Sequence, residues 1–142
     1  LEAYVAAYVG HTTVSEAQYY LADCLLLLAR QRNLEGLNAA SDSLLELSYQ
    51  EFRILATNGS EPWQQLARFH LLDEGLEDKD KSEKLSLLQE RLGALRQIDT
   101  LNTEILTAAE LKLAHAHFHA ATQPQEWQAA ADAYVANNSK LD

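Results

Sequence analysis

The chain has 142 residues, which suits one domain with its own hydrophobic core. Its formal net charge of −10 provides no basic stripe to neutralise phosphates, so we expect no nucleic-acid partner and favour a neutral or basic one. Leucine and alanine dominate the composition, whereas the β-branched residues valine and isoleucine, which favour strands, number only seven. The composition therefore predicts an all-α fold.

The first part of the chain predicts a short helix and then a longer one. Gly10 fits the C-terminal cap of a short amphipathic segment. From Ser15 onward, apolar residues recur at helical spacing: Tyr20, Leu21, Cys24, Leu25 and Leu28. At the polar stretch 31–33 two interpretations stay open. Either Asn33 caps a new helix that starts at Leu34, which we favour, or one helix covers residues 15–57.

The middle of the chain contains a clear stop and a clear start. The stretch NGSEPW ends one helix at Asn58 and begins the next near Pro62, because proline suits the first helical turn. We expect that helix to end at Glu74, since a glycine followed by a leucine, here Gly75 and Leu76, is typical of a Schellman motif.

The last part predicts two or three helices. Ser82 restarts the chain as a helix, and its apolar pattern continues toward Ala121. Thr103 with Glu104 offers another helix cap, although an unbroken helix to Ala121 also fits. Pro124 ends this region, and residues 125–137 form the last helix, for about six helices in all.

Three segments repeat one order of events: a helix end, a short polar turn and a new helix. They are LATNGSEPWQQLA (55–67), AATQPQEWQAAA (120–131) and, more loosely, LARQRNLEGLNAA (28–40). Such repetition is typical of stacked helical hairpins. We therefore expect residues 1–142 to form a single all-helical domain of antiparallel hairpins.

The segment QRNLEGLNAASDSLLEL resembles the turn and second helix of a tetratricopeptide repeat, and EWQAAADAY (126–134) is similar to it. The resemblance covers about a third of the chain. The glycine and tyrosine of the repeat's first helix are replaced by Leu25 and Leu28. The resemblance implies a non-enzymatic scaffold or adaptor that binds a protein or peptide in a groove, and a cytoplasmic location goes with it.

A second resemblance gives the alternative function. The stretch SYQEFRILATNGSEPWQQLARFHLLDEGLED resembles the extracytoplasmic helical-bundle sensor domains of bacterial receptors. It implies a four-helix-type bundle of long helices, a small ligand and a periplasmic location. The chain lacks methionine and starts at Leu1, which indicates a fragment, and its longest apolar run is shorter than the ~20 residues that span a bilayer. A break near Asn33 distinguishes the scaffold from the sensor.

The candidate chemistry is concentrated in the stretch HAHFHA. On a helix His115 and His119 share one face, whereas His117 points to the opposite side. Zinc needs a third and usually a fourth ligand, and no second histidine or cysteine pair is present. We therefore expect structural residues at a helix end, where a protonated imidazole gains about 0.3–1 kcal/mol, and we predict no metal site and no cofactor.

The remaining residue types favour binding over catalysis. Cys24, the single cysteine, lies in the apolar run ADCLLLLA, where we expect a buried packing residue. No glycine-rich phosphate loop or carboxylate in an apolar cleft is visible, so we predict no catalytic residues and no enzyme. Aromatic residues cluster near the joints. Packing explains each tryptophan, and the functional hypothesis is a partner groove lined by Tyr20, Tyr49, Phe52, Trp63, Trp127 and Tyr134.

Overall fold

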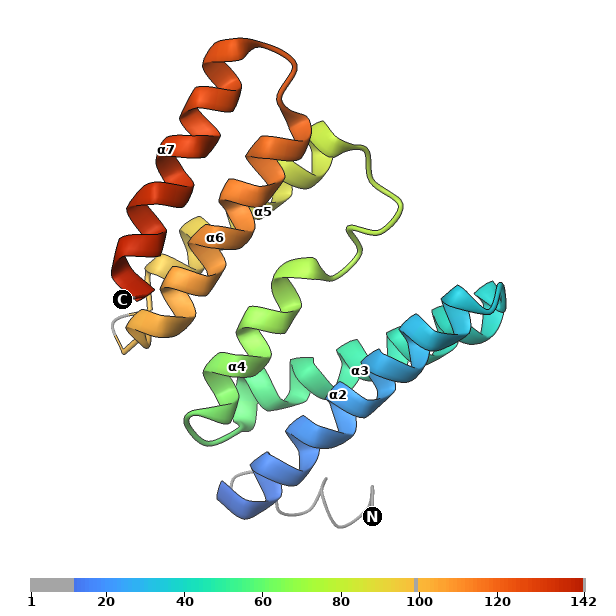
Figure 1. The fold of residues 1–142 in the computed structure, drawn as a ribbon. Coiled ribbons are helices and arrows are strands. Elements are labelled where there is room, and N and C mark those ends of the chain that lie inside the picture. The colour runs from blue at the N-terminus through green and yellow to red at the C-terminus, as the bar shows by residue number, and fades with distance from the viewer. Residues whose placement is uncertain (1–11, 99, 142) are drawn as a thin grey trace. The chain divides into compact units, whose positions relative to one another are not determined.

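The computed structural model describes residues 12–98 and 100–141, and the side chains of residues 13–98 and 100–137 (Figure 1). The short segment predicted to end at Gly10 lies outside the described residues. Within them the fold is all-α, with no strand. The elements in chain order are α2 (Thr12–Leu34), α3 (Asn38–Asn58), α4 (Trp63–His70), the 3-10 turn η1 (Leu71–Asp73), α5 (Lys81–Arg96), α6 (Thr103–Ala120) and α7 (Pro124–Leu141).

The helices pack as antiparallel hairpins, which confirms the predicted all-α array. Within each unit consecutive helices pack on each other, α2 on α3 and α3 on α4 in the first, α5 on α6 and α6 on α7 in the second. The chain divides into two compact units, Leu1–Leu71 and Leu72–Asp142. No helix in the described part of the chain combines the length and the apolar content that a membrane span requires.

The first hairpin turns at a glycine that the sequence analysis placed inside a helix. Gly36 has a φ of +79°, and its backbone N–H donates to the carbonyl of Asn33 at 3.0 Å. The N–H of Leu37 donates to the carbonyl of Arg32 at 2.9 Å. These two bonds make a Schellman motif, whose left-handed position favours glycine. The break is therefore real, but α3 starts at Asn38, and the predicted start at Leu34 is wrong.

The second predicted break falls where the sequence placed it. The side chain of Asn102 accepts hydrogen bonds from the backbone N–H groups of Glu104, at 2.8 Å, and Ile105, at 3.3 Å. An asparagine cap of this kind satisfies amides that have no partner within the helix. Neither residues 15–57 nor residues 85–121 form one helix, so the long-helix bundle is not the fold of this chain.

In the first unit, small residues let α2 and α3 approach closely. Ala22 and Ala29 lie one heptad apart on α2, and Ser41 and Ser48 have the same spacing on α3; all four are buried. The Ser48 hydroxyl donates to the carbonyl of Ala22 at 2.7 Å, and the Ser41 hydroxyl donates to that of Ala29 at 2.8 Å. Each buried hydroxyl is thus satisfied by the facing helix, and the two bonds fix the register of the hairpin.

The short helix α4 closes the core of this unit. Phe52 and Leu55 of α3 are fully buried there, together with Ala67 of α4. The imidazole of His70 stacks on the ring of Phe52 with centroids 4.4 Å apart and an interplanar angle of 10°. Trp63 lies at the edge of the same cluster and is half-buried.

In the second unit, the turn after η1 is held by a side chain of α5. Gly75 has a φ of +73° and makes the predicted turn, and Leu76 is buried. The helix itself ends earlier than the predicted Glu74, since α4 stops at His70 and η1 at Asp73. Arg91 of α5 donates to the carbonyls of Leu72, at 2.9 Å, and Glu74, at 2.7 Å. The helix α5 begins one residue before the predicted Ser82, and its cap is Asp80, whose carboxylate accepts from the Glu83 N–H at 2.9 Å.

Each of the three repeated segments contains the connection between two consecutive helices, which we call a joint. The joints are α2/α3, α3/α4 and α6/α7. The two tryptophans differ in position, however. Trp63 is the first residue of α4, whereas α7 starts at Pro124 and Trp127 follows within its first turn. Equivalent sequence positions therefore place the two indoles differently on their helices.

Candidate protein-binding surface

The helix α2 is apolar on two opposite sides, and one of them is covered by the helices that the structure describes in its unit. The buried side carries Ala22, Leu26 and Ala29 and packs on α3. The other side carries a row of exposed residues at helical spacing, which we call the outer face of α2: Tyr20, Cys24, Leu27, Leu28 and Leu34. A surface helix usually carries charged residues opposite its core face, so this face departs from the ordinary pattern.

The residues of the outer face are about half exposed or more, and the most exposed of them, Leu34, lies at the tip of the hairpin. Tyr20 exposes 52% of its surface, Leu27 54% and Leu34 82%. Leu37, in the turn that follows, is exposed as well. Scattered exposed leucines are normal on a protein surface, whereas a contiguous row is a mark of interaction sites.

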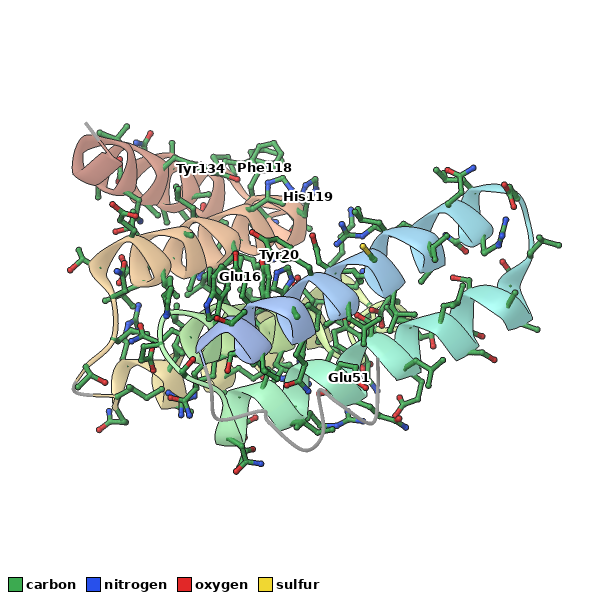
Figure 2. All side chains as sticks on the ribbon, turned by 90° about the horizontal axis from the view of Figure 1, so that it is seen from below. Glu16, Tyr20, Glu51, Phe118, His119 and Tyr134 are labelled. Carbon is green, nitrogen blue, oxygen red and sulfur yellow. The ribbon has the colours of Figure 1, made fainter. Side chains whose placement is uncertain are left out.

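Acidic side chains lie beside the N-terminal part of the outer face. Glu16 and Asp23 alternate with Tyr20 and Leu27 at a spacing of three or four residues, so the four lie on one side of α2. Figure 2 labels Glu16 and Tyr20 at the base of this helix. An apolar row with acidic neighbours is electrostatically complementary to an amphipathic helix with basic residues beside its apolar face.

Four of the six aromatic residues predicted for a groove belong to the first unit, and they have different environments. Tyr49 and Phe52 expose 4% and 0% of their surface, so they form the core and line no groove; the prediction is wrong for these two. Tyr20 and Trp63 do lie together at the surface of this unit, with ring centroids 5.8 Å apart. Their neighbour Tyr19 fills the space between Trp63 and the core.

The other two predicted residues belong to the second unit. Trp127 exposes 48% of its surface, so packing accounts for only about half of this indole. Tyr134 is half-buried, and its hydroxyl lies 2.9 Å from Nδ1 of His115. Phe118 and Val135 are exposed nearby on the helices of the same hairpin.

The predicted burial of Cys24 is wrong, because its side chain is exposed on the outer face. The leucines of the same face were not identified as site residues. Their signal was present in the run CLLLLA, since four consecutive leucines cannot all point to one side of a helix. A run of this kind predicts a second apolar face.

The three histidines are arranged as helical geometry requires. Nε2 of His115 and Nε2 of His119 are 2.9 Å apart, whereas His117 points elsewhere and contacts Gln89 at 3.5 Å. All three lie in the last two turns of α6, as expected. Within residues 12–98 and 100–141, no group of three or more His, Cys, Asp or Glu side chains converges as a metal centre would.

The fold and this surface define an all-α protein built from antiparallel hairpins, one of which exposes an apolar helix face. Comparison of the chain with family models, with curated proteins and with solved structures yields no match. The feature that indicates a function is therefore the outer face of α2.

Proposed function

We propose that this protein is a non-enzymatic helical scaffold or adaptor that binds a protein or peptide partner, and that the outer face of α2 is its docking surface. One observation carries the proposal. Leu27 and Leu34 are exposed on the side of α2 opposite Ala22 and Ala29, which already pack on α3. Fully burying an exposed leucine side chain contributes about 1.5–3 kcal/mol. Covering such a row with a partner therefore favours association.

The chemistry of the surface indicates the partner. The row of apolar residues along α2 suits the apolar side of a second helix, a common mode of peptide recognition. Glu16 and Asp23, within a chain of net charge −10, favour a partner with lysine or arginine beside its apolar residues. We therefore assign the partner as a basic amphipathic helix of a protein or peptide.

The hairpin joints support a tetratricopeptide-like version of this proposal. In that version the partner occupies a groove next to Tyr20 and Trp63, as well as the row of leucines. The sensor alternative expects one helix over residues 15–57, and the turn at Gly36 supports the scaffold instead.

The proposal is tested with a model peptide instead of an unidentified partner. A fluorescein-labelled helical peptide, with leucines on one face and lysines beside them, is titrated with the protein, and its anisotropy is followed. We expect L27Q and L34Q each to weaken binding about 10-fold, which corresponds to losing about 1.4 kcal/mol of apolar burial.

The matched control is L47Q, because Leu47 of α3 is exposed to a similar degree but lies outside the outer face. It should bind as tightly as the wild type. A peptide of the same composition with its leucines spread around the helix should bind at least 10-fold more weakly than the amphipathic one. Equal affinity for both peptides, or equal losses in L27Q and L47Q, would show that the outer face is not a docking surface.

The electrostatic part of the proposal has its own test. Screening acts over about 8 Å at physiological ionic strength, so affinity for the lysine-bearing peptide should fall as salt is raised. An otherwise identical peptide with glutamate in place of lysine should bind more weakly at low salt. Salt-independent affinity would show that Glu16 and Asp23 do not contribute to binding and that the partner is held by apolar contacts alone.

A further inference from the structure

The end of α6 brings two imidazole nitrogens to one point. Nε2 of His115 and Nε2 of His119 are 2.9 Å apart, and the two rings meet edge to face with centroids 4.3 Å apart. Both side chains are exposed. Two neutral imidazoles at this distance share one proton, because one nitrogen must donate while the other offers its lone pair. The same point accepts a metal ion when both nitrogens offer lone pairs.

The separation of the two nitrogens is compatible with adjacent positions around one metal ion. Metal–imidazole bonds of 2.0–2.1 Å place two adjacent ligands about 2.9 Å apart at a right angle, as in a square-planar or tetragonal site. The tetrahedral geometry of zinc needs about 3.3 Å. The observed 2.9 Å is a hydrogen-bond distance in the metal-free protein, and a small adjustment of either exposed ring fits both geometries. Copper(II) is favoured because it binds nitrogen ligands more tightly than its neighbours in the first transition row.

A third residue fixes the orientation of the first imidazole. The hydroxyl of Tyr134, on α7, lies 2.9 Å from Nδ1 of His115. When Nδ1–H donates to the tyrosine oxygen, the lone pair of the same ring is on Nε2 and faces His119. Figure 2 labels His119 and Tyr134, which come from the two adjacent helices of this hairpin. Hydrogen bonds of this type set the tautomer of metal-ligating histidines.

We propose that His115 and His119 form a two-imidazole site for copper(II), with Tyr134 as the positioning residue and water in the remaining coordination positions. The site is independent of the outer face of α2. The proposal departs from the expectation of no metal site at these histidines, because water takes the coordination positions for which a zinc centre would need further protein ligands. Metal binding competes with protons for the same nitrogens, so affinity decreases as the pH is lowered.

The test uses untagged protein titrated with copper(II) in a weakly coordinating buffer, followed by calorimetry and by electron paramagnetic resonance. We expect one equivalent to bind with a spectrum that shows two equatorial nitrogens. H115Q and H119Q should each weaken that binding at least 10-fold. The matched control is H117Q, since His117 lies on the same helix without a histidine partner, and it should bind copper(II) as the wild type does.

Two further measurements separate this site from nonspecific binding. Y134F should retain the stoichiometry and weaken the affinity about 10-fold, because the orienting hydrogen bond is lost. Zinc(II) should bind more weakly than copper(II), in line with the general order of affinities. Unchanged copper affinity in H115Q and H119Q, or an equal loss in H117Q, would overturn the proposal. Since both histidines are exposed, the metal-free melting temperatures of these variants should match the wild type.

Discussion

The hydroxyl of Tyr19 and Nε2 of His70 lie 2.9 Å apart, joining residues 51 positions apart in the chain. The bond ties α2 to the end of α4, beside the stacked rings of Phe52 and His70. It makes Tyr19 a structural residue, in contrast to its exposed neighbour Tyr20.

Replacing Tyr19 by phenylalanine should destabilise the first unit by about 1 kcal/mol, the usual net contribution of one hydrogen bond. The measurement is the midpoint of urea unfolding. Y20F, on the outer face, should change the stability by less than about 0.5 kcal/mol. A larger effect of Y20F than of Y19F would contradict the structural role of the Tyr19–His70 bond.

The same residue predicts how stability depends on alkaline pH. Burial, followed by the charge of Asp23, raises the pKa of Tyr19 above its ordinary value of 10.0. The folded state therefore holds the phenolic proton more tightly than the unfolded state does. Its contribution to stability is complete below pH 10 and is lost as the pH rises through the higher, folded pKa. Unfolding free energies measured above pH 10 should fall more steeply for the wild type than for Y19F, and parallel slopes would refute this linkage.

Ser48→Ala should weaken the α2/α3 hairpin. The variant loses the 2.7 Å hydrogen bond to the Ala22 carbonyl, and we expect a cost of about 1–2 kcal/mol. Ser48→Leu should cost more, because a large side chain forces the closely packed helices apart. Ser43→Ala on the exposed side of α3 is the control and should be close to neutral. Thermal unfolding of the three variants distinguishes these outcomes, and a neutral S48A would mean that the hydroxyl does not fix the register.

The two tryptophans should differ in their contributions to stability. Trp63→Ala empties a site next to the core and should cost about 3 kcal/mol, whereas Trp127→Ala, at a half-exposed site, should cost about 1 kcal/mol. Trp63→Phe should cost much less than Trp63→Ala. The indole Nε1 is buried with no hydrogen-bond acceptor among the described residues, and phenylalanine removes that unsatisfied donor. Equal losses of unfolding free energy in the two alanine variants, measured by denaturant unfolding, would show that the exposure of each indole does not determine its contribution to stability.

Arg91→Met should destabilise the second unit by about 2 kcal/mol, because two bonds from a charged donor to the carbonyls of Leu72 and Glu74 are lost. Lysine at this position should restore only part of that stability, since both bonds come from Nη1 of Arg91 and the lysine side chain is one atom shorter. The control is Arg96→Met. The exposed guanidinium of Arg96 contacts Glu110 at 3.4 Å, which predicts a loss below about 0.5 kcal/mol in the same unfolding assay.

Some of this architecture could be predicted from the sequence because the signals are local. The Asn102 cap, the stop after Asn58 and the turn at Gly75 each depend on a few adjacent residues whose backbone preferences are strong. The approach of His115 to His119 likewise follows from the 3.6-residue period of one helix. The break after α2 was predicted as well, but at Asn33, because the glycine that makes the turn was interpreted as part of the next helix.

Tertiary packing decided which of the apolar faces are buried. Periodicity places Ala22 on one side of α2 and Leu27 on the opposite side. Both sides carry apolar residues at helical spacing, so either could be the core face. The small residues of α3 decide between them, because Ser41 and Ser48 allow close approach only to the alanine side of α2. The exposure of Cys24 and of the leucines follows from that choice. The burial of Phe52 depends likewise on α4, whose His70 stacks on its ring, a contact between segments that no local pattern encodes.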